Sequence, residues 1–285
     1  MDLDLIYDQD QIFQADLEMR IRVLTGIWIF ITAFLYVQLA FAQCNVSNTV
    51  FGNGEQISYT VSYNWGPVWV DAGLVTFSAT NELYLGKPAW HFKSTGKTFT
   101  SYDLFFKVRD YYDSWVDPEA FHSLDFRRYV YEGGYTLLNT LKFDYSGQKI
   151  ICNTKTMNNP QRTDTLRMRP CTFDMLSAIY YTRTLDFKDM RPDSKRQVTV
   201  LIDDAYYDIF IRYIGKEIVE NPNGKRYNCI KFAAKMVQGT IFRGNEDVLV
   251  WVTDDANKVP VYIEAKIIVG TVKAYMKEAK GLRNQ

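Results

Sequence analysis

The chain has 285 residues, and its 33 basic and 33 acidic side chains leave no net charge when histidine is neutral. Aromatic residues make up 15% of the chain, a content that suits pleated sheets and apolar pockets and excludes a disordered protein. Lysine and arginine form no clustered stripe, so nucleic acid is excluded as an expected partner.

The N-terminal region predicts an export signal that begins at an internal methionine. Met19-Arg20-Ile21-Arg22 is a short basic start, an apolar run follows, and Ala40-Phe41-Ala42 has the small-x-small pattern that signal peptidase cuts. Residues 1–18 carry six carboxylates and no basic side chain, so we interpret them as a mis-called start. We expect residues 19–42 to be the signal peptide and the protein to reach the periplasm or the outer-membrane periphery.

A transmembrane anchor is the competing interpretation, because about 20 apolar residues can span a bilayer. The Ala-x-Ala ending and the polar interruptions of the run favour cleavage instead. Gln43 precedes Cys44, where lipid attachment needs a small residue, so a lipoprotein is not expected. Once the signal is removed, residues 43–285 are expected to be a single exported domain and not an integral membrane protein.

From residue 55 onward the pattern is one of successive strands. Residues 56–63 alternate between polar and apolar side chains, which predicts a strand. Turn residues separate each later segment from the next. The further predicted strands are 68–80, 89–95, 105–116, 121–131, 135–145 and 148–155. We therefore expect a mainly β protein: a large curved antiparallel sheet or half-barrel.

One segment predicts a helix packed against this sheet. In residues 172–187, Thr172 is the expected N-cap and Asp174 falls in the first turn. Leu176, Ile179 and Arg183 follow at helical spacing, so one stripe would face the sheet.

The two sides of this helix resemble each other. Gly86-Lys87 precedes Trp115 upstream, and Gly224-Lys225 precedes Trp251 downstream at nearly the same spacing. The pattern indicates two similar β-meander halves, 54–160 and 195–285, that pack as one body. Chance resemblance between aromatic meanders is the alternative.

Four cysteines remain after cleavage at residue 42. In an exported chain an even number makes disulfides possible, and four cysteines allow three pairings. If one bridge forms, we favour Cys152–Cys171, which would close a short loop. Cys229 lies in an apolar-alternating run and is equally well interpreted as a buried thiol, while Cys44 is left without an assigned partner.

No pattern predicts catalysis, a metal site or a cofactor. His91 and His122 are the two histidines, and they fall in different strands without metal-ligand spacing. Asp254-Asp255 is followed by no closing glutamate of a calcium loop and is better interpreted as a hairpin turn. We therefore expect a non-enzymatic protein.

The functional hint is apolar and aromatic. A strongly curved sheet lined with rings can form a pocket for a lipid or another apolar ligand, although rings can also simply fill the core. The residues expected to contact such a ligand are Tyr59, Tyr63, Trp65, Trp90, Trp115, Tyr180 and Trp251. The second hypothesis is an envelope structural or assembly module that binds another protein.

Three segments carry a family resemblance. Residues 54–66 with Asp71-Ala72-Gly73, residues 173–183, and the strand pair 251–264 resemble a family of exported bacterial proteins known only as a domain of unknown function. The resemblance implies a Gram-negative periplasmic or envelope protein and brings no activity. The Trp-x-x-Asp turn followed by Pro260-Val261-Tyr262 also resembles strand pairs of periplasmic lipoprotein carriers, which are curved half-barrels closed by helices.

Overall fold

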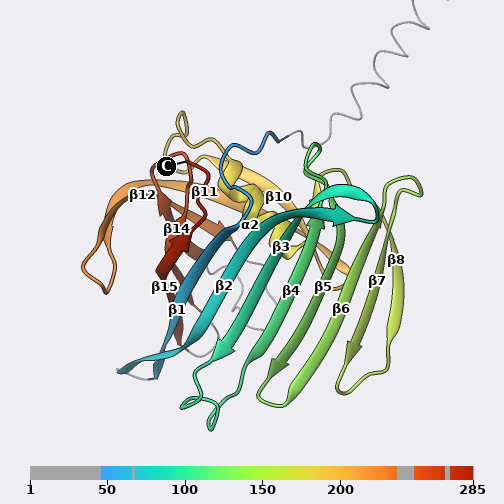
Figure 1. Cartoon of the computed structure of the whole chain (residues 1–285), viewed down its shortest axis with the longest axis horizontal. Helices are drawn as coiled ribbons and strands as arrows, with labels where there is room; N and C mark the ends of the chain where they lie inside the picture. The colour runs from blue at the N-terminus through green and yellow to red at the C-terminus, as the bar shows by residue number, and fades with distance from the viewer. Residues whose placement is uncertain (1–45, 66–67, 236–246, 267–269, 285) are drawn as a thin grey trace, which may run out of the picture. The chain divides into compact units, whose positions relative to one another are not determined.

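Alternating side chains and turn residues build one open, curved sheet in the computed structural model of the chain (Figure 1). The structure describes residues 46–65, 68–235, 247–266 and 270–284. The predicted start and signal peptide, residues 1–42, lie outside the described residues. The strands are β1 Glu55–Trp65, β2 Val68–Tyr84, β3 Lys87–Thr98, β4 Arg109–Val116, β5 Ser123–Glu132, β6 Tyr135–Asp144, β7 Lys149–Thr156, β8 Arg162–Arg167, β9 Thr172–Phe173, β10 Lys195–Ile202, β11 Ala205–Glu220, β12 Arg226–Lys235, β13 Asp247–Thr253, β14 Pro260–Lys266 and β15 Thr271–Lys280.

The middle of the sheet is formed by the two ends of the described chain. β1 pairs antiparallel with β15, from Gln56 opposite Lys280 to Tyr63 opposite Val272. On one side of this pair the strands follow in order from β2 to β8, and on the other side from β14 back to β9. We call β1–β8 the N-terminal half and β9–β15 the C-terminal half. The predicted mainly β fold with a large curved antiparallel sheet is confirmed.

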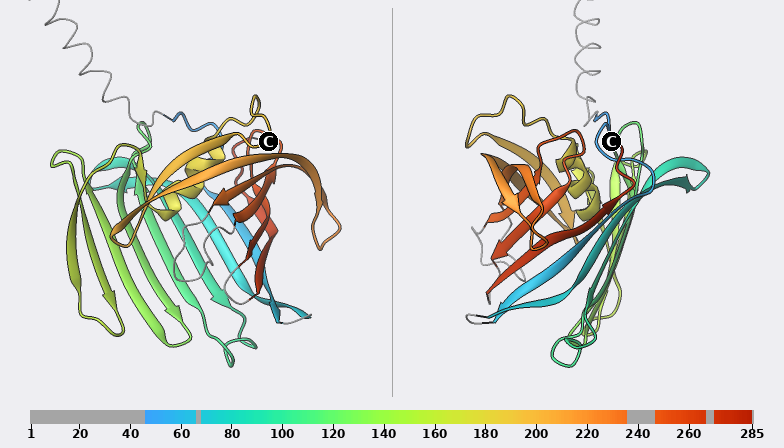
Figure 2. Two further views of the ribbon diagram at one scale, coloured as in Figure 1. Left: turned by 180° about the vertical axis from the view of Figure 1, so that it is seen from behind. Right: turned by 60° about the vertical axis from the view of Figure 1, so that its left-hand side comes forward.

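The helix α2, Met175–Thr184, lies between the N-terminal and C-terminal halves of the curved sheet (Figure 2). It packs against β3 and β4 of the N-terminal half and against β9 and β10 of the C-terminal half. Its buried side chains include Leu176, Tyr180 and Arg183, at the predicted helical spacing. The predicted packed helix is therefore confirmed, with shorter bounds than 172–187.

The predicted N-cap at Thr172 is wrong. Asp174 caps the helix, because its extended backbone lets the carboxylate accept hydrogen bonds from Leu176 N and Ser177 N. The second oxygen of the same carboxylate accepts from Ser114 Oγ and Ser123 Oγ, each at 2.7 Å. The cap therefore also fastens α2 to strands β4 and β5.

The predicted Cys152–Cys171 disulfide is also wrong. Cys152 is a free, buried thiol within the main core, while Cys171 is disulfide-bonded, so Cys152 is not its partner. Cys152 lies in the interior of β7 opposite Leu141, and its thiol is packed among core side chains. Cys229 is a free, buried thiol, as one of the two interpretations expected.

The two edges of the sheet, β8 and β9, are not paired with each other in a ladder. Side chains instead connect the β10–β11 hairpin to the N-terminal half. Arg128 and Arg162 form ion pairs with the hairpin residues Asp203 and Asp204, respectively. Tyr206 Oη donates to the carbonyl of Arg167 at 2.6 Å. These contacts connect the C-terminal half, which folds back over α2 in Figure 2, to the N-terminal half.

Among the residues that the structure describes, no helix has the length and apolar character needed to cross a membrane.

An apolar cavity beside helix α2

A cavity of about 300 Å³ lies between α2 and the inner face of the C-terminal half. Strands β1 and β2 complete its wall from the N-terminal half. The lining residues are Ile57, Tyr59, Phe77, Met175, Ala178, Ile179, Tyr180, Thr182, Arg183, Val198, Val200, Ile202, Ile209, Ile211, Phe232, Ala234, Val248, Val250, Val252, Pro260 and Ile263. The volume is at the lower end of the range of small-molecule sites.

The wall of the cavity follows from the period of two along each strand. In β10, the side chains of Val198, Val200 and Ile202 all point to one face, and the same alternation recurs in β11 and β13. These β-branched aliphatic side chains present only carbon to the cavity. Ile179 of α2 lies at the open side, because 41% of its surface remains exposed while it lines the cavity.

Two of the lining residues are tyrosines whose side chains are buried. Tyr59 Oη donates to the carbonyl of Pro260 at 3.0 Å. Tyr180 Oη is buried and has no hydrogen-bond partner among the described residues. Burial raises the pKa of both phenols above the usual value, so both keep their protons. The Tyr180 hydroxyl is therefore a buried donor that nothing in the described structure satisfies.

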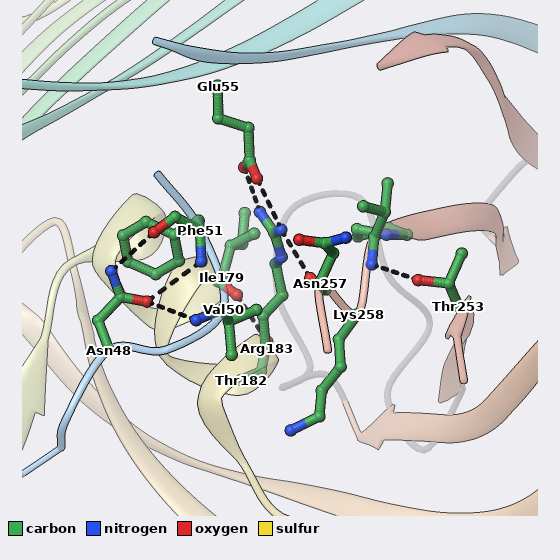
Figure 3. A network of polar contacts seen from close by, with 12 residues as sticks. Asn48, Val50, Phe51, Glu55, Ile179, Thr182, Arg183, Thr253, Asn257 and Lys258 are labelled. Atoms are coloured by element: carbon green, nitrogen blue, oxygen red, sulfur yellow. Dashed lines mark hydrogen bonds and ion pairs between the residues drawn. The ribbon is translucent and has the colours of Figure 1, made fainter. Parts of the chain in front are cut away.

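A buried ion pair fixes the helix beside the cavity (Figure 3). Arg183 donates two hydrogen bonds to the carboxylate of Glu55, at 2.5 and 3.0 Å, and a third to the carbonyl of Asn257 at 2.9 Å. The guanidinium also lies 5.6 Å from the ring centre of Tyr180. The charge of Arg183 is thus already matched by Glu55 and is not free for a ligand carboxylate.

The structure places two of the predicted ligand-contacting residues, Tyr59 and Tyr180, in the lining of the cavity. Trp90 packs against Phe51 in the main core, with ring centres 5.1 Å apart. Tyr63 is half-buried further along β1. The side chain of Trp65 lies outside what the structure describes.

The other two tryptophans point away from the cavity. Trp251 lies between Val250 and Val252 in β13, and both valines line the cavity. Side chains alternate along a strand, so the Trp251 ring is on the face of β13 opposite the cavity. Trp115 follows Ser114, which faces α2, so its ring is on the outer face of β4. Whether these rings contact a ligand stays a prediction. The aliphatic lining of the cavity was not predicted from the sequence. The alternating Val and Ile residues in 198–202 and 248–252 could have indicated it.

The histidines lie in separate environments. His91 is held on the outer face between two carboxylates, with Nε2 2.8 Å from Asp113 and Nδ1 3.1 Å from Glu82, and it stacks on Trp115. His122 stacks on Tyr145, and burial lowers its pKa. Within the described ranges, no three His, Cys, Asp or Glu side chains are grouped so that they could hold a metal ion.

Comparison with known proteins identifies the family. Residues 58–277 match the family described as "Protein of unknown function (DUF3108)", and the chain belongs to this family. No curated protein matches the chain. A crystal structure titled as a β-barrel-like protein of the domain of unknown function DUF1849, from Brucella abortus, is similar in fold, with a TM-score of 0.52 and 9% identity. The similarity covers 81% of this chain and 98% of that one, and at this identity it supports the fold alone.

Proposed function

We propose that the protein is an exported, non-enzymatic binding protein that holds an acyl chain, or a similar apolar group of a ligand, in the cavity beside α2. The supporting observation is the cavity itself. Its lining is almost entirely aliphatic or aromatic, and it is enclosed by a helix and the inner face of a curved sheet. Such a space favours a ligand that loses little by leaving water.

The two tyrosines of the lining favour an amphipathic ligand. The hydroxyl of Tyr180 is a buried donor without a partner among the described residues, so an oxygen of an ester, carboxylic acid or alcohol would satisfy it. A buried donor that gains an acceptor recovers a desolvation cost of about 1–3 kcal/mol. A lipid with one chain in the aliphatic region and an oxygen beside Tyr180 meets both conditions.

The proposed location is the periplasm or the outer-membrane periphery. It is supported by the basic start, apolar run and Ala-x-Ala ending of residues 19–42. In that compartment the protein would meet lipids at the surfaces of both membranes.

Native mass spectrometry tests the proposal directly. The whole chain is expressed in a Gram-negative bacterium, recovered from the periplasm without detergent, and its bound lipids are extracted. We expect a co-purifying species with the mass of a lipid. A clean apo mass in repeated preparations would contradict lipid binding and favour the other hypothesis, an envelope assembly module that binds a protein.

A matched pair of variants links the ligand to this cavity. Ala234 lines the cavity, whereas Ala205 begins the neighbouring strand β11 outside the lining. Ala234→Phe should place a ring in the cavity and remove the lipid from the mass spectrum, while Ala205→Phe should retain it. If both variants carry the lipid as the wild type does, the ligand site is elsewhere.

A further inference from the structure

Connections at one end of the N-terminal half carry exposed apolar side chains. Because β1–β8 form an antiparallel meander, the start of β2 and the β3–β4, β5–β6 and β7–β8 connections all lie at the same end of the sheet, at the bottom of Figure 1. We call the exposed apolar residues of this end the apolar rim: Val68, Trp69, Phe99, Leu104, Phe105, Phe106, Tyr135 and Met157.

The β3–β4 connection, residues 99–108, dominates the rim. Leu104 is 89% exposed, Phe105 73% and Phe106 48%. Loop tips in soluble proteins are normally polar, and three consecutive exposed apolar side chains mark an interaction site.

The acidic side chain of this loop, Asp103, is held at the loop's base. Asp103 accepts from Thr98 Oγ1 at 2.5 Å and from both terminal nitrogens of Arg109, at 2.5 and 3.0 Å. These bonds hold the pKa of the Asp103 carboxyl below its usual value, so the pair stays charged and mutually neutralised. The ion pair therefore lies at the base of the loop, and the apolar residues 104–106 are exposed beyond it.

The loop backbone is also fixed. Tyr102 N donates to Phe99 O at 2.8 Å, and Phe106 N donates to Tyr102 O at 3.1 Å, which forms a tight turn. Phe99 N donates to Ala72 O at 2.9 Å and ties the loop to β2. The ring of Phe106 lies against Gly133, where a Cβ atom would come within 2.4 Å of it. The apolar tip is therefore presented in a preorganised form.

We propose that the apolar rim docks the protein onto a phospholipid bilayer, with the 104–106 tip inserted at the level of the headgroups and upper acyl chains. Hairpin ends that protrude side by side suit a fluid surface, which adapts to any spacing of apolar groups. Exposed Lys97 and Lys107 stand at the base of the loop, where an ammonium can reach lipid phosphates while the tip enters the apolar layer. This inference goes beyond the proposed cavity ligand and does not depend on it.

The bilayer-facing surface continues up the outer face of the sheet. Tyr111, Tyr129 and Leu138 are directly opposite one another on β4, β5 and β6, and all three are exposed. Tyrosine is a residue that favours the interfacial layer of a membrane, because its ring is apolar and its hydroxyl remains hydrated.

Vesicle flotation with a matched pair of variants tests the proposal. Residues 43–285 are used, because all described strands and the helix lie within the compact unit 44–285. Vesicles contain phosphatidylcholine and phosphatidylglycerol in equal parts. Leu104→Ser/Phe105→Ser should lower the partition coefficient by about tenfold or more, since two apolar side chains no longer leave water. The control Leu83→Ser/Leu85→Ser removes two equally exposed leucines at the opposite end of the sheet and should bind as the wild type does.

A fluorescent variant measures insertion itself. Trp69 of the rim gives the wild type its own quenching by lipids brominated on their acyl chains, so Phe105→Trp should be quenched more than the wild type, whereas Leu85→Trp should be quenched no more than the wild type. Absence of wild-type flotation, or equal flotation of the two serine variants, would overturn the proposal. Concentration-dependent dimerisation in sedimentation velocity that is lost in Leu104→Ser/Phe105→Ser, without vesicle binding, would instead assign the rim to a second copy of the chain. Ala234→Phe should bind vesicles normally, so failure of the cavity proposal is distinguishable from failure of this one.

Discussion

Arg183 of α2 and Glu55 of β1 form an ion pair that is sealed from solvent, with side chains 3% and 0% exposed. Glu55 begins the strand at the centre of the sheet, and the same guanidinium reaches the carbonyl of Asn257 in the β13–β14 connection. One side chain therefore holds the helix against both halves of the sheet. Because the cavity lies between α2 and the C-terminal half, this pair also sets the position of one cavity wall.

Glu55→Gln should destabilise the fold strongly, because it leaves the buried guanidinium of Arg183 without its counter-charge. Breaking a buried pair by removing one partner costs about 3–5 kcal/mol. Urea unfolding followed by circular dichroism measures the loss. The double variant Glu55→Met/Arg183→Met removes both charges and should lose less than Glu55→Gln. A single variant within about 1 kcal/mol of the wild type would show that the pair is not a main anchor of α2.

Asp174→Ala should remove the cap of α2 and the helix contact with β4 and β5 together. The carboxylate accepts from Leu176 N, Ser177 N and the hydroxyls of Ser114 and Ser123. Loss of a cap costs about 1 kcal/mol, and buried donors left without an acceptor add about 1–3 kcal/mol.

Asp174→Asn is the matched variant, because its amide oxygen can still accept from the two backbone nitrogens. It should unfold at a higher urea concentration than Asp174→Ala. Equal midpoints for the two variants would mean that the cap oxygen contributes nothing beyond side-chain volume.

Local chemistry in the sequence was enough to predict strands β1 to β7 and the helix. Each predicted break carries turn residues, and the segments between them became β1 to β7 with shifts of a few residues at most of their ends. The pairing of β1 with β15 could not be predicted, because no local pattern links residues more than 200 positions apart. The cap was misplaced for a related reason: Thr172 and Asp174 are both capable caps, and the serines of β4 and β5 select Asp174.

The candidate site was predicted only in part. The high aromatic content of the sequence led to tryptophans being predicted as ligand contacts. The cavity is instead lined mainly by alternating Val and Ile side chains of the C-terminal half. Ile179 was expected on the packed stripe of the helix, yet it lies exposed at the open side of the cavity. Which face of a strand meets a cavity depends on how the two halves fold over α2, and single-strand patterns do not contain that information.

The predicted duplication of the two halves stays a prediction. One tryptophan in each half makes the same kind of hydrogen bond, as a duplication would produce. Trp115 donates its indole N–H to Glu82 at 2.7 Å, and Trp251 donates its own to Glu217. In each case the acceptor lies two strands away across the sheet, on β2 and β11 respectively. His91 stacks on the first indole, and the ammonium of Lys231 lies 4.5 Å from the second.

Cys152 and Cys229 should be unreactive in the folded protein. Burial is the first cause that raises the pKa of each thiol to about 11, so almost no thiolate is present at pH 8. Ellman's reagent at pH 8 should therefore detect neither thiol in native protein and both in urea. The variant Cys152→Ser/Cys229→Ser should show no thiol in urea. Rapid reaction of either thiol without denaturant would contradict the buried positions found here.

Asp110 should make the fold less stable as the pH rises towards neutrality. Burial first, and then the neighbouring Glu132 carboxylate, raise the pKa of Asp110 to about 7, compared with about 3.9 in an unfolded chain. Between these values the folded protein holds a proton that the unfolded chain has released. The free energy of unfolding therefore falls as the pH rises from about 4 to about 7, and the Asp110 contribution is constant above that.

Asp110→Asn keeps the shape of the side chain and cannot lose a proton. Since Asp110 is partly exposed and solvent screens it, we expect the variant to be more stable than the wild type at pH 8 by about 1 kcal/mol, and nearly equal at pH 4. Glu132→Gln removes the neighbouring negative charge and should give a smaller gain of the same sign, because burial of Asp110 remains. Urea unfolding of the three proteins across this pH range measures the difference. Parallel pH profiles for wild type and Asp110→Asn would show that Asp110 ionises in the folded protein as it does in the unfolded chain.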